Sequence, residues 1–348
     1  MSRLRAWPGL AALLVAAAPA AAEITLPPGF SYRLYVTGEG FDASTTRVAP
    51  GLPSTSTLAF DREGVLYLAR TGRRYMASEE DGLQPVFRIP VGGARIRSDA
   101  ERRWTHGPPL WNPQVWSVRG GRELFVTTFD RDRRVGALYR LQDGRTELVA
   151  GGTPERGLPP LLVQPEGVAA DAASHLYVAD RERGAVVKLD AAGRVLDPRW
   201  VSVTRPRLLA VDARGQLWIG ADGTAEAPWQ RGPGEIWKVT AEGAASLVLR
   251  GPMPAGMGLG AGGHLFVADR HAARIFVLDL DGKPVAFAGF TDGDAPRALG
   301  FAPDTPETRR AGLAGDLFVV TISRGAWPVN DVLRISGPFE EFVAGARR

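Results

Sequence analysis

The sequence predicts an all-β protein: a six-bladed β-propeller with four-stranded antiparallel blades around a central channel. The first observation behind this prediction is a repeat. The pattern HLYVAD of residues 175–180 recurs as HLFVAD at residues 264–269, and weaker copies occur at residues 65–70, 123–128, 216–221 and 316–321. The second observation is the spacing of the leucines that the copies share, which lie 41 to 58 residues apart. Short strands repeated at this period are typical of propeller blades.

Each copy is expected to be the second strand of one blade. A strand of small and apolar residues precedes it, at residues 57–64, 115–121, 167–174, 208–215, 256–263 and 298–304. A third strand follows it, at residues 85–90, 137–142, 185–190, 235–240, 274–279 and 331–336. Most copies then add a fourth, outer strand, such as residues 146–151 and 245–250. No amphipathic helix is predicted after the N-terminal segment.

Residues 31–38 form one more strand pattern, which lies ahead of the first blade. We expect this strand to be the outer strand of the last blade, so that it helps to close the ring. Closure removes the long exposed sheet edges that would otherwise pair with other chains. Residues 23–348 are therefore predicted to form a single domain.

The N-terminal segment has the pattern of a secretory signal peptide. Arg3 and Arg5 precede a short apolar run, and small residues stand at Ala20 and Ala22. This pattern predicts cleavage after residue 22 and a periplasmic or secreted protein. No later segment is long and apolar enough for a membrane span.

Composition excludes several classes of site and partner. The chain has no cysteine, which excludes disulfides, attached c-type haem, iron–sulfur clusters and cysteine-based zinc sites. The formal net charge is +4, and two of the arginines belong to the predicted signal peptide. A charge this small gives no reason to expect a nucleic-acid partner.

The repeat also nominates residues that line the channel. In the first five blades the residue ten positions before the shared leucine falls at the start of the innermost strand, and in the last blade the matching residue lies twenty positions before Leu317; five of the six follow a proline. These ring residues are Ser56, Gln114, Glu166, Arg207, Ala255 and Arg297. One interpretation is a polar pocket in which Glu166 acts as an acid or base, while Gln114 and the two arginines bind substrate. The alternative is an ion pair that only neutralises Glu166 against arginine in a narrow channel.

Four loops are longer than the plain repeat, and they are rich in tryptophan and arginine. The loop that begins at Arg70 adds a substrate-binding candidate, and His106 lies in a second loop as a candidate acid or base. Aromatic candidates for stacking on a ligand over the channel are Trp104, Trp111, Trp229 and Trp327. The alternative for these tryptophans is that they pack the loops onto the propeller face.

Residues 165–190 and 255–279 resemble NHL repeats. Residues 26–38 and 315–325 resemble the two ends of glucose/sorbosone dehydrogenase-like propellers. The resemblance covers nearly the whole mature chain and implies the six-bladed fold. It implies no single activity, because that superfamily includes lactonases, sugar dehydrogenases, lyases and binding modules.

The resemblance also raises the question of a cofactor. Gluconolactonase-type propellers hold a divalent cation with Glu, Asn and Asp in the channel, and only Glu166 corresponds to such a ligand. Two arginines in the same ring act against a cation, so no metal is predicted unless Asp180 or Asp269 lies close by. Quinone-dependent sugar dehydrogenases use a loop histidine, but no copy of their local motif surrounds His106. The cofactor is left unassigned.

The sequence therefore predicts a protein that acts on or binds a small polar or anionic, sugar-derived molecule at the channel mouth. If it is an enzyme, the resemblance implies sugar dehydrogenase-like or lactonase-like chemistry. The alternative is a non-catalytic NHL-type module that binds a protein or glycan partner.

Overall fold

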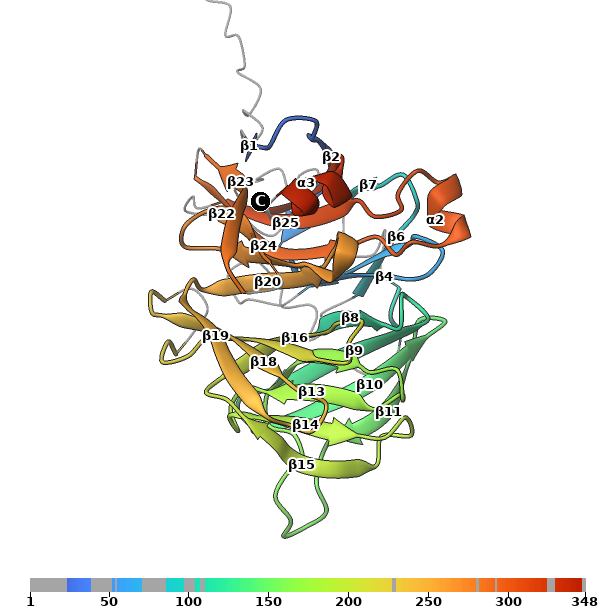
Figure 1. Ribbon diagram of the computed structural model, residues 1–348. Coiled ribbons are helices and arrows are strands. Elements are labelled where there is room, and N and C mark those ends of the chain that lie inside the picture. Colours follow the sequence, from blue (N-terminus) through green and yellow to red (C-terminus); the bar gives the residue numbers. More distant parts are fainter. Residues whose placement is uncertain are drawn as a thin grey trace, which may run out of the picture.

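The structure is a six-bladed β-propeller, and this confirms the fold prediction. The computed structural model describes residues 24–38, 52–53, 55–70, 86–96, 104–106, 110–226, 230–279, 282–291, 293–323 and 329–345. Their strands form six sheets, five of which have four or more strands. Blades 1, 5 and 6 lie in the upper half of Figure 1, and blades 2, 3 and 4 lie in the lower half.

The first three blades follow one another along the chain. Blade 1 consists of β4 (Thr55–Phe60), β5 (Leu66–Arg70) and β6 (Val86–Ile89). Blade 2 consists of β8 (Gln114–Val118), β9 (Glu123–Asp130), β10 (Val135–Gln142) and β11 (Arg145–Gly151). Blade 3 consists of β12 (Pro165–Ala170), β13 (Leu176–Asp180), β14 (Ala185–Leu189) and β15 (Val195–Ser202).

The last three blades include the strands from the N-terminal region. Blade 4 consists of β16 (Pro206–Val211), β17 (Leu217–Ala221), β18 (Gly234–Val239) and β19 (Ala245–Gly251). Blade 5 consists of β20 (Pro254–Leu259), β21 (Leu265–Asp269), β22 (Arg274–Leu278) and β23 (Pro284–Phe290), with β1 (Ile24–Thr25) at its edge. Blade 6 consists of β24 (Asp294–Phe301), β25 (Leu317–Ser323), β26 (Val329–Ser336), β2 (Ser31–Gly38) and β7 (Ala94–Ile96), and β3 (Leu52–Pro53) also pairs with β26.

The ring closes as the sequence predicts. The innermost strands β4, β8, β12, β16, β20 and β24 each contact the next, and β24 contacts β4. The strand β2 pairs antiparallel with β26, with Tyr32 opposite Ile335, so the N-terminal region supplies an outer strand of the last blade. The two ends of the propeller are therefore joined by backbone hydrogen bonds within one sheet.

Within the described residues the sheet of blade 1 has three strands, where the sequence predicts four. The segment that follows β6 leaves the blade, and β7 pairs in parallel with β2 of blade 6. At the outer edge of blade 1 the amide of Trp104 donates to the Val86 carbonyl at 2.9 Å. The strand β7, which follows blade 1 in the chain, thus joins the sheet of blade 6 and links the two blades. The repeat pattern does not predict this pairing.

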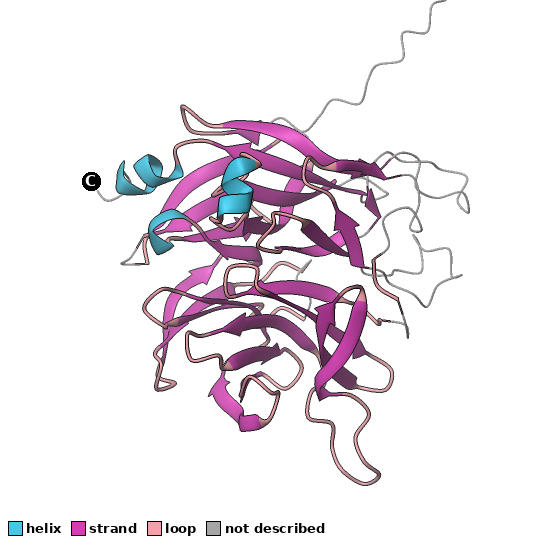
Figure 2. Cartoon of the chain, turned by 90° about the vertical axis from the view of Figure 1, so that its right-hand side faces the viewer, coloured by secondary structure: helices cyan, strands magenta, loops and turns pink. Residues whose placement is uncertain are grey.

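Short helices occur where the sequence analysis predicted none. The helix α2 (Pro306–Arg310) lies in blade 6 between β24 and β25, and α3 (Phe339–Gly345) ends the described chain. In Figure 2 the helical segments lie along one side of the molecule. Phe339 and Val343 of α3 are buried in a cluster that includes Phe266 and Phe287 of blade 5. None of the described helices is long and apolar enough to cross a membrane.

One buried side chain holds blades 1 and 6 together beside the channel. The Asn330 side chain is 0% exposed, and its Oδ1 accepts the Thr55 amide at 2.7 Å. Its Nδ2 donates to the Thr321 carbonyl at 2.7 Å, so one amide group satisfies two backbone groups. Asn330 therefore links β4, the innermost strand of blade 1, to β25 and β26 of blade 6.

We expect Asn330→Ala to lower the free energy of unfolding by about 2 kcal/mol, because buried backbone groups lose their partners. Urea denaturation followed by circular dichroism measures the change. Gln142→Ala, on the exposed hairpin of blade 2, is the matched control and should have little effect. Equal stability of the two variants would show that the Asn330 bonds do not hold the ring closed.

Candidate functional site

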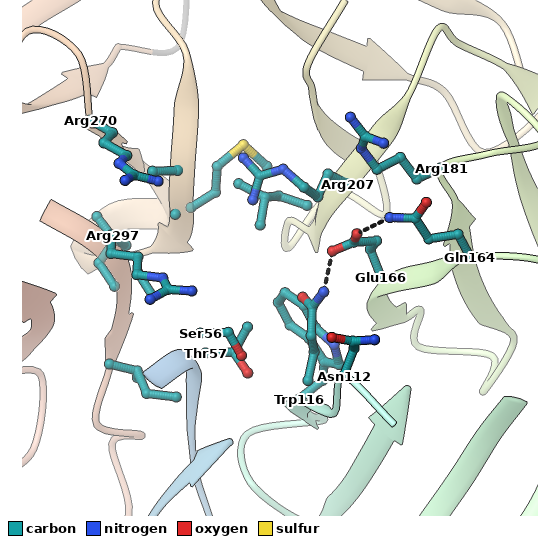
Figure 3. A pocket seen from close by; sticks show the side chains of 18 of the residues that line it. Ser56, Thr57, Asn112, Trp116, Gln164, Glu166, Arg181, Arg207, Arg270 and Arg297 are labelled. Carbon is teal, nitrogen blue, oxygen red and sulfur yellow. Dashed lines mark hydrogen bonds between the residues drawn. The ribbon is translucent and has the colours of Figure 1, made fainter. Parts of the chain in front are cut away.

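A cavity of about 330 Å³ lies at the mouth of the channel. All six ring residues line it, as the repeat register predicts: Ser56, Gln114, Glu166, Arg207, Ala255 and Arg297. Figure 3 shows Arg270 and Arg297 on the opposite side of this cavity from Glu166, Gln164 and Arg181. The volume lies at the lower end of the range for small-molecule sites in proteins.

In five of the six blades the ring residue lies at a β-bulge of the innermost strand; blade 2, with Gln114, has a regular register. The pairing register shifts between Pro165 and Val168, between Pro206 and Leu208, and at the corresponding point of blades 1, 5 and 6. A bulge redirects a side chain, and it tolerates a proline that cannot donate to the ladder. The Pro-X pattern coincides with a bulge in blades 3 to 6, where it marks the point at which the ring residue enters the cavity.

Close packing of neighbouring innermost strands supports the same geometry. A Cβ added at Gly167 would lie 2.6 Å from the Arg207 carbonyl oxygen. Only a glycine allows blades 3 and 4 to approach this closely next to Glu166. Gly167 therefore provides the backbone space that lets Glu166 lie at the boundary between blades 3 and 4.

Glu166 is buried and is held by two amide side chains rather than by an arginine. Its two carboxyl oxygens accept from the Gln114 and Gln164 side-chain amides, the second at 2.8 Å. Burial raises the pKa of Glu166, and it outweighs the charge of Arg207 and the two amide bonds, which lower that pKa. A carboxyl group with a raised pKa can hold its proton closer to neutral pH than an exposed one.

The alternative of an ion pair between Glu166 and a ring arginine differs from the contacts in the structure, in which Arg207 binds Asp222 instead. Arg207 Nε donates to Asp222 Oδ1 at 2.8 Å, and Arg181 Nε donates to Asp222 Oδ2 at 2.9 Å. Asp222 is 0% exposed, so one buried carboxylate fixes guanidinium groups from blades 3 and 4. None of the ion pairs among the described residues contains Glu166.

The remaining bonds of the two arginines run to the backbone. Arg207 Nη2 donates to the Pro254 carbonyl, and Arg181 Nη2 donates to the Glu226 carbonyl at 2.5 Å. Each guanidinium carries five N–H donors, and these bonds use two of them. Both arginines are therefore held in place and still have donors for a ligand.

The lining of the cavity carries an excess of positive charge. Its described residues include five arginines and two carboxylates, Glu166 and Glu226. The arginines are Arg131, Arg181, Arg207, Arg270 and Arg297. Trp116, Phe129, Met257 and several leucines add an apolar part to the wall. A mixed wall of this kind suits an organic anion.

Several of the predicted loop residues lie away from this cavity. His106 is exposed, and its amide donates to the Gly144 carbonyl at 2.8 Å, at the hairpin between β10 and β11. Trp104 packs against Tyr67, with ring centroids 4.6 Å apart and the rings tilted by 45°. This contact agrees with the alternative that Trp104 packs its loop onto the propeller. Trp111 is 47% exposed and does not line the cavity. The roles predicted for these residues gain no support from their positions.

The other predicted loop residues lie outside the described part of the chain. Trp229 and Trp327 lie wholly outside the described residues, whereas the backbone of Arg70 ends β5 and only its side chain is not described. Their proposed contacts with a ligand stay predictions.

The described residues do not offer a cation site. No group of three or more histidine, aspartate or glutamate side chains gathers anywhere in the described ranges. Asp180 accepts the amides of Val163 and Gln164 at 2.8 and 3.0 Å and does not line the cavity. Asp269 accepts the Ala272 amide at 3.2 Å. Arginines outnumber carboxylates around Glu166, so the donor set does not fit the divalent cation of gluconolactonase-type propellers.

Sequence reasoning found the ring residues but missed the rest of the lining, and the repeat offered a signal for several of the missed residues. Arg181 and Arg270 each follow the VAD pattern directly, at the same position of the repeat. Asp222 occupies this position in blade 4, which is why it meets Arg181 of the neighbouring blade. Gln164 had a signal as well, because it lies two positions before its ring residue, as Asn112 does in blade 2. Trp116 lies two positions after its ring residue, as Met257 does in blade 5.

Comparison with known proteins supports the fold. No family model matches the sequence, and no curated protein matches it. A putative oxidoreductase (glucose dehydrogenase) from Thermus thermophilus is 14% identical with a TM-score of 0.53, over 88% of this chain and 100% of that one. The PQQ-bound aldose sugar dehydrogenase from Streptomyces coelicolor is 13% identical with a TM-score of 0.52, over 90% and 100%.

A protein with a different stated role is similar to the same degree. It is an auxiliary nutrient binding protein from Bacteroides thetaiotaomicron, 11% identical with a TM-score of 0.55, over 91% of this chain and 77% of that one. At these identities the similarity establishes the architecture alone. This chain is a six-bladed propeller that matches glucose and aldose sugar dehydrogenases in structure, and its activity has to be argued from its own cavity.

Proposed function

We propose that the chain binds a small organic anion, such as a sugar acid, in the cavity at the channel mouth. The observation that carries the proposal is the charge of the lining, in which five arginines face two carboxylates. The buried carboxylate of Asp222 offsets part of this charge but lies behind Arg181 and Arg207. An anionic group complements the excess of arginine over carboxylate among the described lining residues.

The arrangement of the walls suggests how the ligand lies. Arg297 and Arg270 reach the cavity from one side, and Arg207 is held on another wall by Asp222. Carboxylate groups bind guanidinium groups through two parallel hydrogen bonds, which fixes orientation as well as charge. The amides of Gln114 and Gln164 and the ring of Trp116 then face the neutral part of the molecule, which suits hydroxyl groups and an apolar sugar face.

The place of this binding is also part of the proposal. Because residues 1–22 have the pattern of a signal peptide, we propose that the ligand is met in the periplasm or the medium. A protein or glycan partner on the tryptophan-bearing loops stays an alternative prediction, since Trp229 and Trp327 lie outside the described residues.

Calorimetric titration with D-galacturonate, and with D-galactose as the neutral control, tests the proposal. We expect galacturonate to bind with a Kd below about 1 mM, a free energy of about −4 kcal/mol. Galactose should bind at least about tenfold more weakly, because it cannot bind the arginines through a carboxylate. Rising salt should weaken the binding of galacturonate.

Arg297→Gln is the variant that tests the site itself, and we expect it to weaken galacturonate binding about tenfold or more. Arg145→Gln, on the exposed outer strand of blade 2, removes the same charge far from the cavity and serves as the control. Equal affinity for galacturonate and galactose, or equal effects of the two substitutions, would contradict the proposal.

A second candidate function is acid–base catalysis by Glu166 on the bound molecule. The favouring observation is a buried carboxyl group of raised pKa that opens onto a cavity. The chemistry would be of the sugar dehydrogenase or lactonase type suggested by the resemblance. Turnover of D-galacturonate or of a sugar lactone that disappears in Glu166→Gln, with binding retained, would establish this function; turnover that persists would remove Glu166 from the mechanism.

A further inference from the structure

A second cavity, of about 310 Å³, adjoins the first at the channel mouth. The two cavities share five lining residues: Phe129, Arg131, Gln164, Arg181 and Glu226. The shared residues place the two cavities side by side where blades 2, 3 and 4 meet, and we call the pair a trough. We call the first cavity the inner subsite and the second the outer subsite.

The outer subsite is built from the loops that flank the inner strands. Asp130 and Arg134 lie at the turn between β9 and β10, Val163 precedes β12, Glu182 follows β13, and Arg205 precedes β16. These segments come from three adjacent blades, so the trough runs outward from the ring residues across the propeller face. Its lining is mostly charged, in contrast to the apolar part of the inner wall.

Two arginines of the outer subsite, Arg131 and Arg205, form no ion pair within the described residues, although Asp130 and Glu226 line the same cavity. Arg205 Nη1 donates to the carbonyls of Gly223 and Thr224 at 3.3 and 2.8 Å, which fixes its guanidinium without neutralising it. In the described ranges no ion pair contains Arg131 or Arg205. Arg134, by contrast, pairs with Glu182 at 2.9 Å. A fixed guanidinium with free charge is a site for a second anionic group.

From this geometry we propose that the ligand is an acidic oligosaccharide of at least two sugar units. The inference rests on the proposed function and extends it: one acidic unit occupies the inner subsite, and the next occupies the outer one. Arg205 and Arg131 bind the second carboxylate, while Arg134 and Glu182 bind hydroxyl groups. Phe129, on the shared wall, offers an apolar surface at the junction of the two units.

A comparison of D-galacturonate with α-1,4-linked digalacturonate tests the inference by calorimetric titration. We expect the wild-type protein to bind digalacturonate at least about tenfold more tightly, because the second carboxylate gains the outer arginines. Arg205→Gln should remove this gain and leave the affinity for galacturonate within about twofold of the wild-type value.

Arg134→Gln is a second variant, because its side chain is 68% exposed and the substitution does not touch the fold. It should reduce the gain from the second unit by a smaller factor than Arg205→Gln, since Arg134 already has Glu182 as a partner. Arg145→Gln again serves as the control and should keep the full gain. Thermal unfolding of each variant checks that the fold is intact.

The outcomes separate this inference from the proposed function. If galacturonate and digalacturonate bind equally, the inference is wrong and the inner subsite stands. If the gain persists in both Arg205→Gln and Arg134→Gln, the second unit does not lie in the outer subsite, and the inference is again wrong. If neither compound binds, the proposed sugar acid and the oligosaccharide are both excluded.

Discussion

Replacing Asp222 by asparagine is expected to lower the free energy of unfolding by roughly 3–5 kcal/mol. The substitution keeps the shape of the side chain but leaves the guanidinium groups of Arg181 and Arg207 without their buried counter-charge. Both arginines are largely buried, with 7% and 9% of their side chains exposed, so water cannot take the place of the carboxylate. Urea denaturation of the wild-type protein and of Asp222→Asn measures the loss.

The same variant also reports on the anion site. Sulfate or galacturonate should raise the unfolding temperature of Asp222→Asn more than that of the wild-type protein, because an anion in the cavity replaces part of the missing charge. Asp304→Asn is the matched control, since Asp304 binds Arg309 through two bonds of 2.6 and 2.7 Å on the exposed surface. It should have a far smaller effect. A variant as stable as the wild type would show that Asp222 does not hold these arginines.

Glu166→Gln is expected to change how galacturonate binding depends on pH. Burial raises the pKa of Glu166, so in the wild-type protein the carboxyl loses its proton above the usual range for glutamate. Once ionised, it repels the bound carboxylate, and the affinity should fall about tenfold or more as pH rises through this pKa. Glutamine cannot ionise, so Glu166→Gln should keep a nearly constant affinity from about pH 5 to pH 9.

The pH dependence of stability provides an independent check. A carboxyl whose pKa is raised by folding holds more protons in the folded state than in the unfolded state, between the unfolded pKa of about 4.5 and the raised value. Stability therefore falls as pH rises across this window and then levels off. Because Glu166→Gln lacks this contribution, its stability relative to the wild type should rise with pH over the same window.

Glu226→Gln is the control for both measurements. Glu226 lines the same cavity but is exposed, so its loss should leave the pH at which the affinity falls unchanged. An identical pH profile for the wild-type protein and Glu166→Gln would show that Glu166 does not titrate beside the ligand. If Glu226→Gln, and not Glu166→Gln, bound galacturonate more tightly than the wild-type protein at high pH, the repelling carboxylate would be Glu226 and the prediction for Glu166 would be wrong.

The propeller and its ring of channel residues could be predicted because both recur in every blade. A repeat that cannot bury its own faces has to stack against its neighbours, and six copies at this period specify the ring. The Pro-X pattern marks the bulges from which Glu166, Arg207 and Arg297 enter the cavity. The outer strand supplied by residues 31–38 followed from the same logic of closure.

The pairing of β7 with β2 of blade 6, instead of with its own blade, could not be predicted in this way. The segment after β6 has a strand pattern whether it pairs within its own blade or with β2. Trp104 shows the same ambiguity, because a tryptophan in a long loop can face a ligand or pack on Tyr67. Such choices depend on which surfaces lie next to one another, and sequence spacing contains no record of them.

The residues alone specify six blades, the order in which they close, and which side chain of each blade faces the channel. These features follow from local periodicity, which every repeat carries within itself. The partners of those side chains are decided in three dimensions. Arg207 binds Asp222 of its own blade, and Arg181 reaches the same carboxylate from the blade before. Glu166 binds the amide of Gln114, the ring residue of the blade before, and that of Gln164 two residues earlier in the chain. The repeat places all three near the channel, but only the packing of the blades decides that Glu166 meets these amides rather than an arginine.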